Sequence, residues 1–470
     1  MKNSSCTVFG FKKKGNLIFA FYFSRYKMTK TVNGFSKKTK EEKIAWLAST
    51  YLENNPQAIS ILKHYWNTDE KLQKLHDDFI ENAISNYYLP FAIAPNFLIN
   101  GKLYALPMVI EESSVVAAAG NAAKFWLDRG GFKAEVISTT KNGQIHLNYY
   151  GEPEILEEFF DFIQPVLKAS ISDIEKNMKA RKGGLIELSL TDKTEVLEGY
   201  YFIHATFETL DAMGANFINS CLEKMAQVFE NEAQQYEAFK HQNTLPEVVM
   251  SILSNYVPEC MVRAEVSCHV DELSTKQLDG KKFASKFVRA ISIAKAETRR
   301  AVTHNKGIMN GIDAVVIATG NDFRAVEAGI HAYAVRNNYY TSLTHAEVKE
   351  DIFKFWIEIP LAIGTVGGLT SLHPMTKLAL EILKNPSAKE LMEIIAVAGL
   401  AQNFAAIRSL ITTGIQKGHM KMHLMNILNQ QEATEHEKKL AISHFSEATV
   451  SHSAVVRFLN AMRNESSKLE

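Results

Sequence analysis

The spacing of apolar residues along the chain predicts a mixture of helices and strands. Helices are expected at Lys40–Leu52, Asp69–Ala83, Val115–Leu127, Pro153–Met178, Asp211–Gln227, Gly280–Thr303 and Ala325–Val335, and a buried helix pair at Ala388–Thr412. Strands are expected at Leu103–Ile110, Ala134–Ile137, Ile145–Tyr150, Leu185–Leu190, Tyr200–Glu208, Ala264–Val270 and within Val348–Ile363. The mixture is typical of an α+β protein, and 470 residues are enough for two or three domains.

Some short segments are assigned from their local residues. Leu89–Gly101 contains two prolines and is expected to be a loop. Ala314–Ala318 is an apolar run that is too short for a helix of its own and suits a buried strand. Ser113 or Ser114 is expected to cap the alanine-rich helix that follows, and the glycines at 130 and 131 are expected to end it.

The pattern of predicted strands and helices changes at about Ser138 and changes back near Pro246. Between these points strands and helices follow one another in an order that suits a small two-layer α+β domain. This segment has no GxGxxG motif, so a Rossmann unit is not expected.

Composition restricts the possible partners. The 52 basic residues equal the 52 acidic ones, and a net charge of zero argues against bulk nucleic-acid binding. No segment reaches the ~18–20 apolar residues that a membrane span requires. Residues 1–27 have a basic run before a short apolar patch without a cleavage site, and are expected to be a disordered tail or a misplaced start.

The four cysteines lack the spacing of a disulfide framework or a metal site, which indicates a reducing cytoplasm. Cys268-His269 is only half of a metal site. His419 and His423 are four residues apart, but no HExxH carboxylate lies between them. No metal is therefore expected, and the alternative for His419 is a catalytic histidine on a mobile terminal segment.

The segment from Thr303 to Arg324 concentrates chemically active residues around the apolar run. Lys306 and Asp322 could meet if the chain doubles back, and a desolvated lysine beside a carboxylate is suited to stabilising an oxyanion. The alternative is a glycine-rich loop with a surface ion pair. Further candidates are Glu111 or Glu112, although a helix dipole also favours a carboxylate at that position.

Asp211–Asn216, with the sequence DAMGAN, lies where a strand is followed by a helix. The free N–H groups of a helix N-terminus can bind an anion such as a pyrophosphate, although an ordinary helix start is the alternative. Together, an acid, a fixed cation and an imidazole suit carbonyl chemistry with an anionic intermediate. No GxSxG or cysteine-nucleophile motif is present, which argues against an acyl-enzyme mechanism.

Seven motifs occur in the order found in one known family. They are LPxAIAxNFxING at Leu89–Gly101, EESSVVAAA at Glu111–Ala119, DAMGAN at Asp211–Asn216, RAVTHNKGIMNGID at Arg300–Asp313, ATGNDFRAVEAGIHAYA at Ala318–Ala334, GLAQN at Gly399–Asn403 and GIQKGHM at Gly414–Met420. On these motifs, which span about residues 33–460, the chain resembles the 3-hydroxy-3-methylglutaryl-CoA (HMG-CoA) reductases, specifically their soluble bacterial class, class II.

The resemblance implies reduction of HMG-CoA to mevalonate for isoprenoid metabolism, by two hydrides from nicotinamide cofactors, through a hemithioacetal and mevaldehyde. By motif position, Glu112 resembles the catalytic glutamate, Lys306 the oxyanion-holding lysine and Asp322 the aspartate that couples them. His419 resembles the histidine that protonates the CoA thiolate. The remaining assignments are substrate-binding residues Ser114, Arg300, Asn310 and Asn403, and cofactor-binding residues Asp211, Met213, Gly214, Ala215 and Asn216.

The resemblance also implies a fold and an assembly. Residues 28–138 and 251–413 would form a large substrate-binding α/β domain around a central helix. Residues 139–250 would form an inserted ferredoxin-like NAD(P)-binding domain, and 414–470 a C-terminal flap. The family forms homodimers with the site at the subunit interface.

Two departures from the family pattern concern the ligands. Ser36 stands near the position of an arginine that contacts a CoA phosphate in relatives, and Lys37 or Lys38 could substitute for it. Asp173 and Glu175 lie where an acidic residue would bond the ribose hydroxyls, so NAD is favoured over NADP, although basic residues lie nearby.

Two other classes of function stay open. One is a CoA-dependent lyase or acyl-transfer enzyme, which would use Lys306 and Glu112 without a nicotinamide. The other is a non-catalytic dimeric CoA-binding protein. Both would leave the DAMGAN turn and His419 without a role.

Overall fold

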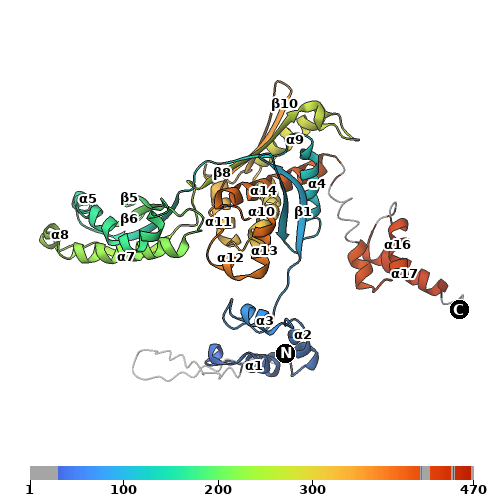
Figure 1. Cartoon of the computed structure of the whole chain (residues 1–470), viewed down its shortest axis with the longest axis horizontal. Helices are drawn as coiled ribbons and strands as arrows, with labels where there is room; N and C mark the ends of the chain where they lie inside the picture. Colours follow the sequence, from blue (N-terminus) through green and yellow to red (C-terminus); the bar gives the residue numbers. More distant parts are fainter. Residues whose placement is uncertain (1–29, 413, 415–423, 446–447, 449, 467–470) are drawn as a thin grey trace, which may run out of the picture. The chain divides into compact units, whose positions relative to one another are not determined.

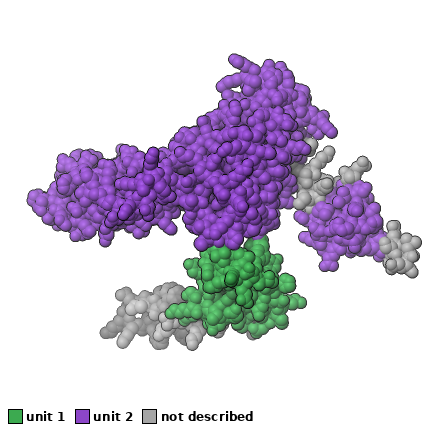
Figure 2. Space-filling model, in the orientation of Figure 1, with its two compact units in different colours: residues 1–88 green, residues 89–470 purple. Residues whose placement is uncertain are grey.

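The computed structural model describes residues 30–412, 414, 424–445, 448 and 450–466 (Figure 1). The chain divides into two compact units, residues 1–88 and 89–470, which are described separately (Figure 2).

The first unit is built from short helices. They are the 3₁₀ helix Phe35–Lys37, α1 (Lys40–Tyr51), α2 (Pro56–His64) and α3 (Glu70–Asp77). A capping box between Thr39 and Glu42 starts α1, and an ion pair of 2.8 Å between Lys40 and Asp77 joins α1 to α3. The prediction placed the end of α3 too late: Asn82 has a φ of 63°, which a helix cannot accommodate.

The larger part of the second unit surrounds one long helix. Its strands are β1 (Phe91–Ile99), β2 (Lys102–Val109), β3 (Lys133–Val136), β8 (Met261–His269), β9 (Thr344–Lys349) and β10 (Ile352–Pro360). Its helices are α4 (Val115–Leu127), α9 (Gly280–Ala296), α10 (Thr298–Ala318), α11 (Phe323–Ala334), α12 (Leu369–Leu372), α13 (Pro374–Ile382) and α14 (Ala388–Ile411), with the 3₁₀ helix Val270–Leu273. Strands β1 and β2 form an antiparallel pair, and the other four form a sheet in the order β3-β8-β10-β9.

Helix α10 is the central element, because it contacts α4, α9, α11, α13, α14 and β2 (Figure 1). Helix α14 crosses it closely: a Cβ at Gly311 would lie 2.5 Å from the Ala398 carbonyl oxygen. The buried strand predicted at Ala314–Ala318 is wrong, since these residues are the last turns of α10. Their apolar character comes from burial on all sides of the helix.

Residues 141–253 form a separate sheet with its own core. Its elements are β4 (Lys141–Asn148), α5 (Pro153–Ser170), α6 (Ser172–Lys179), β5 (Gly184–Asp192), β6 (Tyr200–Glu208), α7 (Ala215–Ala233), α8 (Glu237–Gln242) and β7 (Glu247–Leu253). The antiparallel order β5-β6-β4-β7, with α5 and α7 packed on one face, is ferredoxin-like. The multi-domain α+β class is confirmed, whereas the exact domain bounds stay a prediction.

Three further details correct the sequence interpretation. Leu89–Gly101 contains strand β1, and its proline is accommodated where the β1–β2 register shifts between Ala94 and Phe97. Ala388–Thr412 is one helix rather than a pair, and the predicted helix 153–178 breaks at Ile171.

The C-terminal residues form a small cluster around Leu428, Ala441 and Leu459, with α16 (Glu435–His444) and α17 (His452–Ser466). The helical tail predicted at 414–423, with His419 and His423, lies outside the described residues except for Gly414. Among the described helices, α14 alone is long and apolar enough to cross a membrane, and 67% of the relevant window is buried inside the protein.

Candidate active site

A cavity of about 310 Å³ lies where the start of α4 faces α10 and α14. The predicted residues that line it are Glu112, Ser114, Arg300, Lys306, Asn310 and Asn403. Six residues from three separate motifs therefore lie around one cavity. No single motif by itself predicts this meeting.

The centre of the cavity is a pair of opposite charges. Lys306 Nζ lies 2.5 Å from Glu112 Oε2, and the Asn310 side-chain amide donates to the same oxygen over 3.2 Å. Lys306 and Asn310 reach it together because residues four apart share one helix face. The Lys306 side chain is 59% exposed and the Glu112 side chain 38% exposed, so both groups are accessible from the cavity.

Two further residues fit an anionic ligand. Ser114 is exposed and has a φ of 75°, and its hydroxyl makes no capping bond to α4, contrary to the prediction. Arg300 is half-buried one turn and a half before Lys306, and burial lowers its pKa. A guanidinium held in such a position is suited to binding a carboxylate.

Asn403 is buried in a polar network beneath the cavity. The Thr344 hydroxyl donates to Asn403 Oδ1 over 3.1 Å and lies 2.6 Å from His304 Nε2. Burial, and next the charge of Arg300, lowers the pKa of His304 to about 3, so its imidazole is neutral. The network fixes the orientation of Asn403 at the cavity wall.

Asp322 is not part of this cavity within the chain. It accepts the backbone N–H groups of Arg324 and Ala325 at the start of α11 and pairs with the Arg324 side chain at 3.1 Å. Burial acts to raise the pKa of Asp322, but the hydrogen bonds and charge of Arg324 and the backbone N–H of Ala325 together outweigh it, and the pKa is lowered. Twelve residues of helix separate Lys306 from the end of α10, roughly 18 Å of rise, so the two groups do not meet.

The DAMGAN turn is held from two sides. Asp211 Oδ1 accepts the Ala388 N–H at the start of α14 over 2.7 Å, and the Asp211 carbonyl accepts the Thr365 N–H over 2.8 Å. Gly214 adopts a φ of 92° directly before α7, which starts at Ala215 rather than at Asp211. No side chain caps α7, so its first N–H groups can receive an anion.

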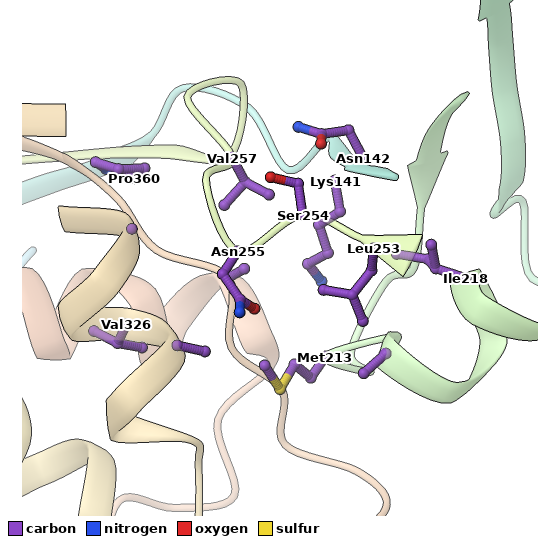
Figure 3. Close-up of a pocket in the computed structure, with 14 residues that line it drawn as sticks. Lys141, Asn142, Met213, Ile218, Leu253, Ser254, Asn255, Val257, Val326 and Pro360 are labelled. Carbon is purple, nitrogen blue, oxygen red and sulfur yellow. The ribbon is translucent and has the colours of Figure 1, made fainter. Parts of the chain in front are cut away.

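A buried lysine supports this turn, and sequence reasoning missed it. Lys141 is 4% exposed, lines a small pocket with Met213 (Figure 3), and donates to the Ala212 carbonyl at 2.8 Å and the Thr209 hydroxyl at 2.5 Å. Burial lowers its pKa. A lysine at the first residue of a buried strand was the signal that could have identified it.

The two acidic residues considered for the ribose differ in their surroundings. Glu175 is fully buried; its Oε1 accepts the Leu185 N–H over 2.5 Å, and Lys179 Nζ lies 2.6 Å from Oε2. Asp173 is exposed on α6. Of the two, Asp173 has a carboxylate open to a ligand. In the described part of the chain, no group of three or more His, Cys, Asp or Glu side chains could hold a metal.

The His304 network was also missed, although His304 lies between Arg300 and Lys306 in the same motif. His304 lies four residues after Arg300, and this spacing was a signal that both side chains could lie on one helix face, toward the cavity. Thr344 gave no signal, because its role depends on contacts between distant segments.

Comparisons with known proteins agree on one family. The family model for hydroxymethylglutaryl-coenzyme A reductase matches residues 40–424. The 3-hydroxy-3-methylglutaryl-coenzyme A reductase of Archaeoglobus fulgidus is 35% identical over 418 residues, 88% of this chain and 90% of the relative. A probable 3-hydroxy-3-methylglutaryl-coenzyme A reductase of Borreliella burgdorferi is 37% identical over 358 residues, 75% of this chain and 79% of the relative.

Solved structures of the Streptococcus pneumoniae 3-hydroxy-3-methylglutaryl-CoA reductase are also similar. One class II structure, bound to NADPH in open conformations, has a TM-score of 0.67 at 34% identity and covers 81% of this chain and 99% of its own. A second has a TM-score of 0.68 at 34% identity and covers 92% of this chain and 99% of its own.

Proposed function

The chain belongs to the hydroxymethylglutaryl-coenzyme A reductase family, and on this basis we propose that it reduces HMG-CoA to mevalonate and free CoA. The reaction takes two hydrides in turn and belongs to the mevalonate pathway. The observation that carries the proposal is the contact of Glu112 with Lys306 at 2.5 Å, inside a cavity that Arg300 and Asn403 also line.

The residues of the cavity divide the chemistry between them. The Lys306 ammonium stabilises the negative charge that develops on the thioester oxygen when its carbon accepts a hydride. Arg300 binds the free carboxylate of the hydroxymethylglutaryl group. Glu112, held between Lys306 and Asn310, donates a proton to the alkoxide formed in the second reduction.

Between the two reductions the carbon–sulfur bond breaks and CoA leaves as a thiolate. We assign protonation of this thiolate to His419, which lies outside the described residues. Mevaldehyde reduction releases no thiolate, so this role belongs to the first half of the reaction alone.

A nicotinamide cofactor supplies the hydride when it is bound. The DAMGAN turn fits its anionic diphosphate, because Gly214 has the backbone conformation of a tight turn and α7 begins without a side-chain cap. We propose NADH over NADPH on the exposed carboxylate of Asp173, which would accept ribose hydroxyls and repel a 2′-phosphate.

We also propose a cytoplasmic homodimer with the site between subunits. Asp322 and the DAMGAN turn both lie near Gly364, whose N–H donates to Asn321 over 2.8 Å and whose Cβ, if added, would meet Met213. The Glu112–Lys306 pair lies toward the other end of α10. A partner subunit that brings its Asp322 to this pair would complete the catalytic set.

The test follows the oxidation of NADH and of NADPH by absorbance, side by side, with purified protein and HMG-CoA. We expect turnover with two reduced cofactors consumed per mevalonate, and a higher rate with NADH. Faster turnover with NADPH would reject the role given to Asp173 but keep the reductase. Folded protein that oxidises neither would favour the CoA lyase or acyl-transfer alternative.

A further inference from the structure

Lys141, the first residue of β4, is the most buried lysine in the part of the chain that the structure describes, with 4% of its surface exposed. Its ammonium donates to two neutral oxygens, the Thr209 hydroxyl over 2.5 Å and the Ala212 carbonyl over 2.8 Å. Lysines usually keep their ammonium in water, because moving the charge into a protein costs more free energy than neutral hydrogen bonds offset. Packing alone therefore does not explain this lysine.

The two carboxylates close enough to act on this charge, Glu208 and Asp211, are engaged elsewhere. Glu208 Oε1 accepts the Leu210 N–H over 2.7 Å, and Asp211 Oδ1 accepts the Ala388 N–H over 2.7 Å. Among the described residues, no carboxylate forms an ion pair with Lys141, whose hydrogen-bond partners are both uncharged. The ammonium is thus a buried positive charge without a direct counter-charge.

The same ammonium belongs to a closed set of hydrogen bonds beneath the DAMGAN turn. The Thr209 hydroxyl, which accepts from Lys141, itself donates to the Ala212 carbonyl over 2.7 Å. Two donors therefore hold one carbonyl of the turn. Thr209 is 1% exposed, and a Cβ at Gly214 would lie 2.5 Å from its methyl group, so the turn packs directly on this set. Lys141 and Thr209 together fix the backbone that leads into α7.

The charge of Lys141 lies close to the start of α7. This helix begins at Ala215, three residues after Ala212, so its first N–H groups are no more than about 11 Å along the chain from the carbonyl that Lys141 contacts. The side chain is directed toward Met213 and lies near the apolar Leu253, which lines the same pocket (Figure 3). Charges interact more strongly across an apolar wall than through water, so the ammonium can stabilise an anion that it does not touch.

We propose that Lys141 is a positioning residue for the nicotinamide cofactor: it holds the DAMGAN turn through the Ala212 carbonyl and supplies a buried positive charge that favours the cofactor's diphosphate at the start of α7. The proposal rests on the proposed function, because it assumes that this turn receives the cofactor. NADH and NADPH share the diphosphate, so Lys141 affects both and takes no part in the choice between them.

The test compares Lys141→Met and Lys141→Arg with the wild type and with a control, Lys224→Met. Methionine has a similar length but no charge, and the Ala212 carbonyl keeps its bond from Thr209, so we expect Lys141→Met to fold. Lys224 is exposed on α7, roughly 14 Å along the helix from its start, so the control removes the same charge from the same helix without touching the turn. Thermal unfolding is recorded for every variant.

The measurements are the affinities for NADH, NADPH and ADP-ribose by calorimetry, and the kinetic constants for NADH and HMG-CoA. We expect Lys141→Met to bind all three nucleotides about tenfold more weakly, through loss of one charge near the diphosphate. The KM for NADH should rise by a similar factor, whereas kcat and the KM for HMG-CoA should stay within twofold of the wild type. Lys141→Arg should regain most of the affinity, and the control should match the wild type.

Unchanged NADH affinity in Lys141→Met, or an equal loss in the Lys224→Met control, would overturn the proposal. So would a fall in kcat together with a lower unfolding temperature, which would make Lys141 a support of the fold alone, or a Lys141→Arg variant that unfolds at the wild-type temperature yet binds as weakly as Lys141→Met. Failure of the proposed function gives a different result. Wild-type protein that turns over no HMG-CoA, but loses NADH affinity on Lys141→Met, would reject the reductase activity and leave the role of Lys141 in place.

Discussion

About two turns along α10 from Lys306, on the same side of the helix, a carboxyl pair is held partly out of water. Asp313 hydrogen-bonds Glu327 of α11, which lies 2.9 Å from His331 Nε2, and His331 Nδ1 lies 2.8 Å from the Tyr340 hydroxyl. Burial, and next Glu327, raises the pKa of Asp313 to about 9. The hydrogen bond from His331 lowers the pKa of Glu327. At neutral pH the pair therefore shares one proton.

This proton makes stability depend on pH in a defined direction. The pKa of Asp313 in the folded protein lies above its unfolded value of 3.8. The stability that protonated Asp313 contributes is therefore fully present below pH 3.8 and is lost as the pH rises toward about 9. The uncharged amide of an Asp313→Asn variant would mimic the protonated carboxyl group at every pH. Relative to the wild type, we expect Asp313→Asn to gain stability as pH rises from 5 to 8, by no more than about 1.4 kcal/mol per pH unit, the limit for one linked proton.

The measurement is the free energy of urea unfolding at several pH values, with Asp161→Asn on the exposed face of α5 as the control. The control should show a constant difference from the wild type. A pH-independent difference for Asp313→Asn as well would mean that Asp313 is ionised in the folded protein.

At the level of single residues, Glu112, Lys306 and Asn310, which the sequence motifs singled out, line one cavity in the structure. Their roles in that cavity stay a prediction. Sequence reasoning could not place Asp322, since the distance from Lys306 depends on whether the residues between them are helix or strand. Lys141 was missed because its role is visible only where its ammonium meets the Ala212 carbonyl.

Among the elements, the crossing of α10 and α14 determines the cavity, because Lys306 and Asn310 lie on one helix and Asn403 on the other. The two helices approach closely because each has a glycine at the crossing, Gly311 on α10 and Gly399 on α14. A Cβ added at Gly399 would lie 2.8 Å from the Ile312 side chain. Local periodicity could not reveal this crossing. It identified both helices as apolar, but α14 is buried nearly all round, and a helix of that kind has no polar face to mark its partner.

The crossing predicts the effect of one methyl group. In Gly311→Ala the new Cβ would lie 2.5 Å from the backbone oxygen of Ala398, which cannot move without shifting α14. The cost of overpacking exceeds the gain in helix propensity, and we expect a net loss of about 2 kcal/mol of stability together with lower turnover.

Gly307→Ala is the matched control, since it lies on the same helix and its added Cβ meets nothing within 4 Å. That variant should be more stable by up to about 1 kcal/mol. Thermal unfolding of both variants decides the matter: equal stabilisation of the two would show that α10 and α14 are farther apart than the structure places them.

For the whole molecule, the two halves of the proposed site lie apart within one chain, which is the basis for proposing a site shared between two subunits. Lys306, which pairs with Glu112, lies in the first half of α10, whereas Asp322 comes after the end of that helix. The DAMGAN turn is hydrogen-bonded to Thr365 and Ala388. These positions are fixed by the length of a helix, so side-chain motion cannot bring Lys306 and Asp322 of one chain together. Assembly of two chains can, and it makes a quantitative prediction.

Lys306→Ala and Asp322→Ala should each lower turnover by about a hundredfold or more as purified homodimers, because each removes a charge from both sites. If each site takes Lys306 from one subunit and Asp322 from the other, a mixed dimer contains one site with both substitutions and one with neither. Random re-association of equal amounts yields half mixed dimers, and therefore about a quarter of wild-type activity. The measurement is HMG-CoA-dependent cofactor oxidation after the two variants are unfolded and refolded together, with each variant refolded alone as the control. Activity that stays at the level of the single variants, in a sample shown to contain mixed dimers, would mean that Lys306 and Asp322 serve the same site from one chain.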